Sequence, residues 1–311
     1  MSHRRLEWLK AATSYLDTWA FAPSRHDRGS LVSYGLALLL LIVPLNQGLA
    51  APSKVVSINL CSDQLLLMLA ARHQIASVSR LALEPHSSFM AAAAVGIPVN
   101  DAKIEQLLTY NPDLILASPF SPPHLLNLLT KLGFRVEKLP HRSNLEGIRD
   151  NIRLMAKWLD RKDQGETLIR EMDRRLAEVE SRLGHLIRTQ SEKPVALFYQ
   201  PRGYTSGSGT LQHEALILAG WRNLSAELGI VGYSGIDLEH LLHGRPDQLF
   251  TSAYTPGSES LAQRSLRHPA LARITGGKPI VQIDYRYWIC GGPMIIDAVE
   301  SLANAHNPGG S

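Results

Sequence analysis

Short apolar runs alternate with amphipathic stretches along the chain after residue 50. In the first half, runs at 55–60, 75–79, 114–117 and 136–139 are brief and rich in branched aliphatic residues, as in buried strands. Apolar residues at helical spacing lie between them, at 64–71 and 125–132. Such alternation is typical of βα units that build a parallel sheet.

The second half repeats this alternation after a long helical connection. Strands are predicted at 195–199, 248–251 and 280–283, and helices at 211–219 and 295–303. Between the halves, Ser143-Asn144-Leu145-Glu146 has the form of a capping box and begins a helix that continues through Trp158. A second, highly charged helix follows a break near 160–163 and runs to about 186. We therefore predict a connection that is mostly helical and limits the movement of the two halves.

One sequence unit occurs once in each half. Ile-Glu-Gln-Leu-Leu at 104–108, followed by Pro112-Asp113 and a strand, recurs as Leu-Glu-His-Leu-Leu at 238–242, followed by Pro246-Asp247 and a strand. A Pro-Asp turn ends each short helix and leads into a buried strand. Copies this far apart do not form a solenoid, whose period is about 20 to 50 residues. They predict two similar α/β lobes, at 51–142 and 191–311, joined by a connecting helix region at 143–190.

The first fifty residues are interpreted as a signal peptide. An apolar run at 34–45 follows a stretch with several arginines, and Gly48-Leu49-Ala50 supplies the small residues that a signal peptidase reads. The run is too short for a typical membrane span, which needs about 20 apolar residues. We expect cleavage after Ala50 and a soluble protein of the periplasm, with an uncleaved signal anchor as the alternative.

Composition and motifs argue against nucleic-acid binding and catalysis. The formal charge of +4 over 311 residues is too small for an electrostatic footprint on nucleic acid. The segment 203–207 resembles a nucleophile elbow, but threonine occupies its central position. Gly207-Ser208-Gly209 lacks the third glycine of a dinucleotide fingerprint. An α/β enzyme is therefore the weaker alternative to a binding protein.

The order and spacing of these motifs resemble the iron-siderophore and cobalamin class of periplasmic binding proteins. The resemblance covers nearly all of 54–303 and rests on Val-Val-Ser-Ile at 55–58, the two Glu-x-Leu-Leu units, and the glycine-containing segments at 204–207 and 218–224. It implies two Rossmann-like lobes joined by a long helix, with a ligand cleft between them. It also implies the substrate-binding component of an ABC importer.

The cleft implied by the resemblance lies against the loops that follow the strands. Six of the nine tyrosines fall between 199 and 287, and aromatic walls suit a large flat ligand such as a corrinoid. Arginines suit an anionic iron chelate. The predicted ligand-binding residues are Asn59, Cys61, Ser62, Arg80, His86, Phe120, His141 and Arg142 in the first lobe, and Tyr199, Arg202, Tyr204, Tyr233, Tyr254, Arg286, Tyr287 and Trp288 in the second.

The two cysteines, Cys61 and Cys290, fall one in each half and leave three alternatives. The cysteines could form a disulfide, remain free thiols, or contact the ligand through their sulfur atoms. No permanently bound cofactor and no metal site are predicted, because His86 and His141 alone are weak evidence for one. The alternative to an iron chelate or corrinoid is a haem, held by a tyrosine or histidine, or a metal ion bound by a protein of the same fold.

The expected partners are the small metal-complex ligand and an inner-membrane ABC permease dimer, bound by a monomer. In the resemblance, Glu105 and Glu239 in the repeated units dock onto the permease. Either glutamate could instead only interact with the dipole of its own helix.

Overall fold

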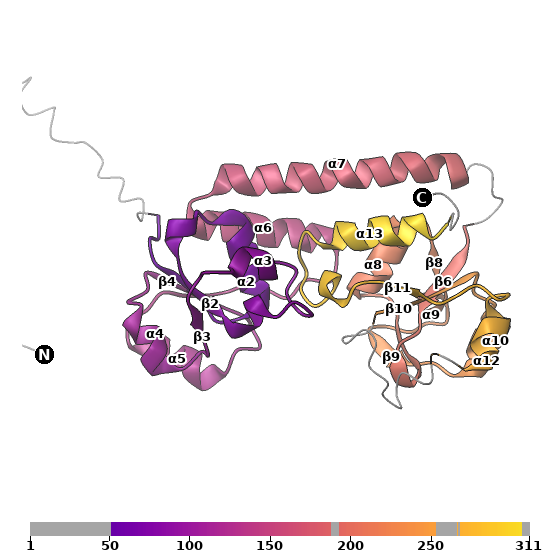
Figure 1. Ribbon diagram of the computed structural model, residues 1–311, viewed down its shortest axis with the longest axis horizontal. Coiled ribbons are helices and arrows are strands. Elements are labelled where there is room, and N and C mark those ends of the chain that lie inside the picture. Colours follow the sequence, from indigo (N-terminus) through magenta and orange to yellow (C-terminus); the bar gives the residue numbers. More distant parts are fainter. Residues whose placement is uncertain (1–50, 188–192, 253–265, 267, 307–311) are drawn as a thin grey trace, which may run out of the picture. The chain divides into compact units, whose positions relative to one another are not determined.

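The computed structural model describes residues 51–187, 193–252, 266 and 268–306 (Figure 1). The predicted signal peptide and Tyr254 lie outside these residues. Among the helices of the described ranges, none combines the length and apolar character that a bilayer-spanning segment needs.

The first lobe is built on a five-stranded parallel sheet in the order β3-β2-β1-β4-β5. Both faces of the sheet are covered. Val55 packs in a core cluster with α2 and the connecting helices, whereas the next residue, Val56, packs with leucines of α4 and α5. The strands are β1 (Val55–Ser57), β2 (Ile75–Ser79), β3 (Val99–Asn100), β4 (Leu114–Ala117) and β5 (Val136–Lys138). The helices are α2 (Leu60–Leu69), α3 (Ala91–Ala94), α4 (Ile104–Thr109) and α5 (Pro123–Lys131), with 3₁₀ turns η1 (Arg72–Gln74) and η2 (Arg80–Leu83).

The second lobe has a four-stranded parallel sheet in the order β11-β10-β6-β8 and a separate antiparallel hairpin, β7-β9. The strands are β6 (Val195–Phe198), β7 (Tyr204–Ser206), β8 (Arg222–Asn223), β9 (Tyr233–Gly235), β10 (Gln248–Thr251) and β11 (Val281–Gln282). The helices are α8 (Leu211–Leu218), α9 (Leu224–Glu227), α10 (Leu238–Gly244), α12 (Pro269–Ile274) and α13 (Ile295–Asn304), with 3₁₀ turns η3 (Pro201–Gly203) and η5 (Tyr285–Tyr287). The predicted α/β class with two parallel sheets is confirmed.

The repeated sequence unit is also a structural repeat. Its copies form α4 with β4 and α10 with β10. In the first copy, the backbone N–H of Asp113 donates to the carbonyl of Lys54, and its carboxylate accepts from the N–H of Lys54 at 3.0 Å. In the second, Asp247 makes the same pair of bonds with Val195, at 2.7 and 2.8 Å. Each Pro-Asp turn therefore holds the start of the central strand of its own lobe.

Two helices, α6 (Leu145–Leu159) and α7 (Lys162–Ile187), connect the lobes, and α7 also packs on α13 (Figure 1). The predicted break falls at Asp160, which has a left-handed backbone with φ of 56°. A Cβ at Gly165 would lie 2.7 Å from the Cβ of Ala156, so the close approach of α6 and α7 requires glycine there.

The structure corrects the predicted start of α6. The N-cap is Asn144, whose Oδ1 accepts from the N–H of Gly147 at 2.8 Å. Ser143 is not the cap, and the carboxylate of Glu146 pairs with Arg149 at 3.0 Å. Asn and Ser are about equally good N-cap residues. Asn144 is the cap because it directly precedes the first residue of the helix, where its side chain reaches the free N–H groups.

Other features were not predicted. The helix α2 begins at Leu60, directly after β1, because the side chain of Asn59 caps it by accepting from the N–H of Cys61. The two-residue strands β3 and β8 and the hairpin β7-β9 carry little apolar periodicity and were missed.

One buried carboxyl group, that of Asp63 on α2, lies between the helix and β2. It accepts from the N–H of Ser79 at 3.0 Å, and its second oxygen bonds to the hydroxyl of Ser79. Burial raises the pKa of Asp63 from 3.8 to about 7, and hydrogen bonds from Ser57 and Ser79 only partly oppose this. The hydroxyl of Ser79 donates this second bond, which favours the charged carboxylate and so limits the rise in pKa.

We predict that Asp63 makes the protein less stable as the pH rises from about 4 to about 7. In that window the unfolded chain releases the proton that the folded chain keeps, so folding becomes less favourable. Asp63→Asn keeps a polar side chain of the same shape and has no proton to lose. The free energy of unfolding of each protein can be measured with urea at pH 5 and pH 8. Relative to Asp63→Asn, the wild-type protein should be less stable at pH 8 than at pH 5. An identical pH dependence of both proteins would contradict the prediction.

Candidate ligand-binding site

Each parallel sheet has one point at which the direction of strand order reverses. It lies between β1 and β4 in the first lobe and between β6 and β10 in the second. At such a point the loops beyond the carboxyl ends of the two strands diverge and leave a crevice, where ligands of open α/β sheets bind. In the first lobe Asn59 lies in the loop after β1, Cys61 lies in the first turn of α2 beyond it, and 118–120 lie in the loop after β4.

A pocket occupies the crevice of the first lobe. Its cavity volume is about 50 Å³, enough for a small chemical group and not for a whole metal complex. It is lined by Asn59, Cys61, Ser118, Pro119, Phe120, Leu139, Pro140, His141, Arg142, Asn151 and Gly291. Five predicted ligand-binding residues, Asn59, Cys61, Phe120, His141 and Arg142, are thereby brought together around one opening.

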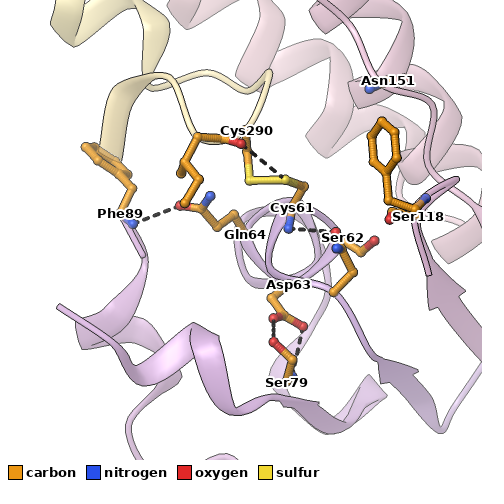
Figure 2. Close-up of a disulfide and its surroundings, with 12 residues drawn as sticks. Cys61, Ser62, Asp63, Gln64, Ser79, Phe89, Ser118, Asn151 and Cys290 are labelled. Atoms are coloured by element: carbon orange, nitrogen blue, oxygen red, sulfur yellow. Dashed lines mark hydrogen bonds between the residues drawn. A yellow bond between two sulfur atoms is a disulfide. The ribbon is translucent and has the colours of Figure 1, made fainter. Parts of the chain in front are cut away.

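The pocket also touches the second lobe. Cys61, in the first turn of α2, forms a disulfide with Cys290, which lies between η5 and α13 (Figure 2). The next residue, Gly291, lines the pocket, and a Cβ there would lie 2.6 Å from the carbonyl oxygen of Arg142. Only glycine allows this approach, so the disulfide and Gly291 hold the second lobe against the rim of the pocket.

Another contact joins the second lobe to the connecting helix α6. The carboxylate of Glu214, on α8, accepts from the N–H of Leu145 in the first turn of α6 at 3.1 Å. A negative charge is favourable at this end of a helix, because the free N–H groups there are partly positive. Farther along the junction, the rings of Phe89 and Tyr287 meet with centroids 6.0 Å apart.

Two residues that line the pocket each have one buried polar atom without a hydrogen-bond partner in the described part of the chain. The side chain of Asn151, on α6, is 2% exposed; its Nδ2 donates to the carbonyl of Pro140 at 2.8 Å, and its Oδ1 has no partner. The Nε of Arg142 is likewise buried without a partner. The stem of Arg142 lies over Gly147, where a Cβ would come within 2.8 Å of the arginine Cδ.

Aromatic side chains are exposed near the carboxyl ends of the strands. Phe120 is 78% exposed and lies edge-on to His141, with ring centroids 5.9 Å apart. On the hairpin of the second lobe, Tyr204 and Tyr233 are also exposed, and the hydroxyl of Tyr233 donates to Gln212 at 2.9 Å. Large exposed rings of this kind are available to cover a flat, apolar ligand.

Three of the predicted ligand-binding side chains are placed in the core instead. The hydroxyl of Ser62 donates to the carbonyl of Ala117, and Tyr199 is 6% exposed. Trp288 is also 6% exposed; its ring packs edge-on against Phe198, and its Nε1 donates to Ser252 at 2.7 Å. These side chains turn into their own lobe because burying their apolar surface is favourable.

The remaining predicted residues lie around the lobes with partners of their own. Arg80 pairs with Asp101 at 2.7 Å, and Arg286 pairs with Asp284. Burial would raise the pKa of Asp284, but its hydrogen bonds from Arg286, and more weakly the charge of His86, lower it overall. Tyr287 is half-buried against Phe89, and Arg202 has a left-handed backbone with φ of 66°.

The sequence reasoning missed Asn151, Gly291 and the loop at 139–140. Asn151 lies on the buried face of α6 beside Ile148 and Ile152. A single amide on an otherwise apolar helical stripe was the signal that could have identified it.

The two predicted docking glutamates occupy equivalent places. Glu105 and Glu239 lie in the first turns of α4 and α10, and both are exposed. Within the described residues neither carboxylate forms an ion pair or a hydrogen bond.

We predict that the disulfide contributes substantially to stability. Replacing both cysteines, as in Cys61→Ala/Cys290→Ala, should lower the free energy of unfolding by roughly 2–5 kcal/mol, because the bond closes a very long loop in the unfolded chain. Urea unfolding without reductant measures the loss. Reduced wild-type protein is the control and should match the variant. Two freely reactive thiols in the native, unreduced protein would contradict the structure.

These features define a ligand-binding protein of the two-lobed class. Each lobe is built on a parallel sheet, helices connect the lobes, and a pocket lies where they meet. A family model described as "Periplasmic binding protein" matches residues 55–278, and the chain belongs to that family. Within it, the fold is that of the class III proteins, which include binders of iron complexes, cobalamin and haem. The family consists of binding proteins and not of enzymes, as predicted.

Curated relatives share moderate identity. The chain is 31% identical over 157 residues to a vitamin B12-binding protein of Vibrio cholerae, covering 49% of this chain and 53% of that protein. It is 21% identical over 263 residues to a cobalamin-binding protein of Halobacterium salinarum, covering 82% and 70%. The chain thus spans about half the length of the Vibrio relatives that it matches.

Solved structures confirm the fold. The periplasmic haem-binding protein HutB of Vibrio cholerae has a TM-score of 0.68 at 21% identity, with 82% of this chain and 99% of that chain covered. The periplasmic vitamin B12-binding protein BtuF of Vibrio cholerae has a TM-score of 0.58 at 20% identity, with 82% and 96% covered. At such identities the likeness concerns the fold and does not identify a ligand.

Proposed function

We propose that the protein is the periplasmic substrate-binding component of an ABC importer, which captures an iron-siderophore or cobalamin-type ligand and delivers it to an inner-membrane permease. The observation that carries this proposal is the pocket at the reversal point of the first sheet. There both lobes contribute to one opening, through Cys61 and Gly291, and the exposed ring of Phe120 stands at its rim.

The chemistry of the opening supports capture and release of a ligand. The pocket volume of about 50 Å³ admits only a protruding group, so the body of a larger ligand would lie outside it against the exposed ring of Phe120. Aromatic faces of this kind bind flat ligands through their large apolar area. Haem is the second candidate ligand, because tyrosine and histidine side chains can bind haem iron and those of Tyr204 and His141 are exposed.

We predict that native mass spectrometry of protein isolated from its host will show a polypeptide that begins near Ala51 and carries a metal chelate or corrinoid. The same ligand should raise the melting temperature of the purified apoprotein, because it binds the folded state alone. No stabilisation by cyanocobalamin, haemin or ferric siderophores would contradict the proposal.

A matched pair of variants locates the binding surface. Phe120→Ala should weaken binding of that ligand by about 1–2 kcal/mol, because aromatic contact area is lost. Leu132→Ala removes an exposed apolar side chain outside the pocket lining and should change nothing.

We further predict that Glu105 and Glu239 bind the permease. The two carboxylates occur at matching places in the repeated α4 and α10 units, exposed and without ion pairs in the described part of the chain. Glu105→Ala/Glu239→Ala should abolish transport and stable binding to the permease, because charged pairs at an interface are worth more than exposed ones. Ligand affinity and melting temperature should stay nearly unchanged.

Glu84→Ala/Glu180→Ala provides the matched control, since it also removes two exposed glutamates that lie outside the repeated units. Normal transport by the Glu105/Glu239 double variant would contradict docking and would mean that both residues only stabilise their own helices.

A further inference from the structure

A groove lies beside Glu239 on the second lobe, between the end of α9 and the helix α10. Its volume is about 480 Å³, and it is lined by Leu228, Glu239, His240, His243 and Gly244. The two helices meet closely, because a Cβ at Gly244 would lie 2.5 Å from the side chain of Leu224. Glu239 and both histidines are exposed, so the groove is accessible to the side chain of a partner protein.

The hydrogen bonds of the two histidine rings determine which ring nitrogen is left free. Nδ1 of His240 lies 2.6 Å from a carboxylate oxygen of Asp237, and Nδ1 of His243 lies 2.8 Å from the carbonyl oxygen of Glu239. Both oxygens accept, so each Nδ1 carries the hydrogen and donates it. In a neutral ring the other nitrogen, Nε2, is then an acceptor. Neither Nε2 has a partner among the described residues.

We infer that this groove binds a guanidinium side chain of the permease, which donates to the carboxylate of Glu239 and to Nε2 of His240 and His243. The inference rests on the proposed function. It adds two binding residues to the predicted glutamate contact, and it makes the second lobe the stronger of the two anchors on the permease.

The side chains of the groove favour a guanidinium over other groups. A carboxylate and two imidazole nitrogens are all acceptors, so an anionic group would face them without forming a hydrogen bond. A guanidinium presents five N–H donors in one plane and can serve several acceptors at once, whereas an ammonium is compact and more strongly hydrated. Leu228 is 42% exposed and gives the groove an apolar wall for the carbon chain that carries the guanidinium.

The equivalent positions of the first lobe carry different side chains with bonds of their own. Gln106, in the place of His240, uses both ends of its amide in backbone hydrogen bonds, at 2.9 and 3.1 Å. Thr109, in the place of His243, donates its hydroxyl to the carbonyl of Gln106 at 2.7 Å. The two repeated units therefore share the glutamate, and the pair of free ring nitrogens lies in the second unit, beside Glu239.

Binding of purified permease in lipid nanodiscs to the immobilised protein tests the inference. His240→Ala/His243→Ala should weaken binding about tenfold, because two hydrogen bonds to a charged group are lost. His73→Ala/His124→Ala is the matched control, since it also removes two exposed histidines, and it should bind as wild type does. Among single variants, Glu239→Ala should weaken binding more than Glu105→Ala.

The glutamate variants separate failure of the groove from failure of docking. Unchanged binding by His240→Ala/His243→Ala, together with a large loss for Glu105→Ala/Glu239→Ala, would refute the groove and leave docking intact. Equal losses for Glu105→Ala and Glu239→Ala would refute the stronger second anchor. Normal binding by the glutamate double variant would refute the docking proposal itself.

A small probe tests the groove without the permease. In an NMR titration, N-acetylarginine amide should shift the ring C–H signals of His240 and His243, which the two single alanine variants identify. N-acetylcitrulline amide has nearly the same shape without the charge and should shift them far less. Equal shifts with the citrulline or the corresponding lysine derivative, or no shift with the arginine derivative, would refute a guanidinium site.

Discussion

The rule that parallel strands cannot be joined by tight hairpins governs most of this structure. Every connection between neighbouring parallel strands must cross a face of the sheet, which places helices on both faces and buries the strands between them. Val55 and Val56 show the result, because adjacent residues of β1 pack into separate core clusters. Because all strands of a parallel sheet run in one direction, the loops that follow them lie at the same edge of the sheet. The pocket lies at that edge, where the strand order reverses.

This rule also explains which parts could be predicted from the sequence. The strands β4 and β10 each follow a Pro-Asp turn, and β4 is a continuous apolar run, so their places were evident. Asn59, Phe120 and Arg142 were expected near a ligand because the family resemblance places the loops after strands at the cleft, and the pocket lining includes all three. The short strands β3 and β8 and the β7-β9 hairpin depend on pairing with distant segments and carry little periodicity of their own.

The orientation of individual side chains was beyond such reasoning. Trp288 follows the last strand of its lobe just as Phe120 follows β4, yet Trp288 is buried and Phe120 is exposed. The difference comes from Phe198 and Ser252, which give the indole ring a packing surface and its N–H a partner. Asn151 illustrates the opposite error: its position halfway along α6 gave no reason to place it beside loops that it meets only in the folded protein.

The disulfide gives the chain the topology of a ring with two tails. Cys61 and Cys290 are separated by 229 positions, so the bond encloses both connecting helices and most of each lobe. Tension applied between the two ends of the chain would pass from one tail to the other through the sulfur atoms. The enclosed segment would bear almost none of that load. Pulling on the termini would therefore extend only the tails, which carry β1 and α13, and the segment between the cysteines could not be drawn out until the bond itself is cut.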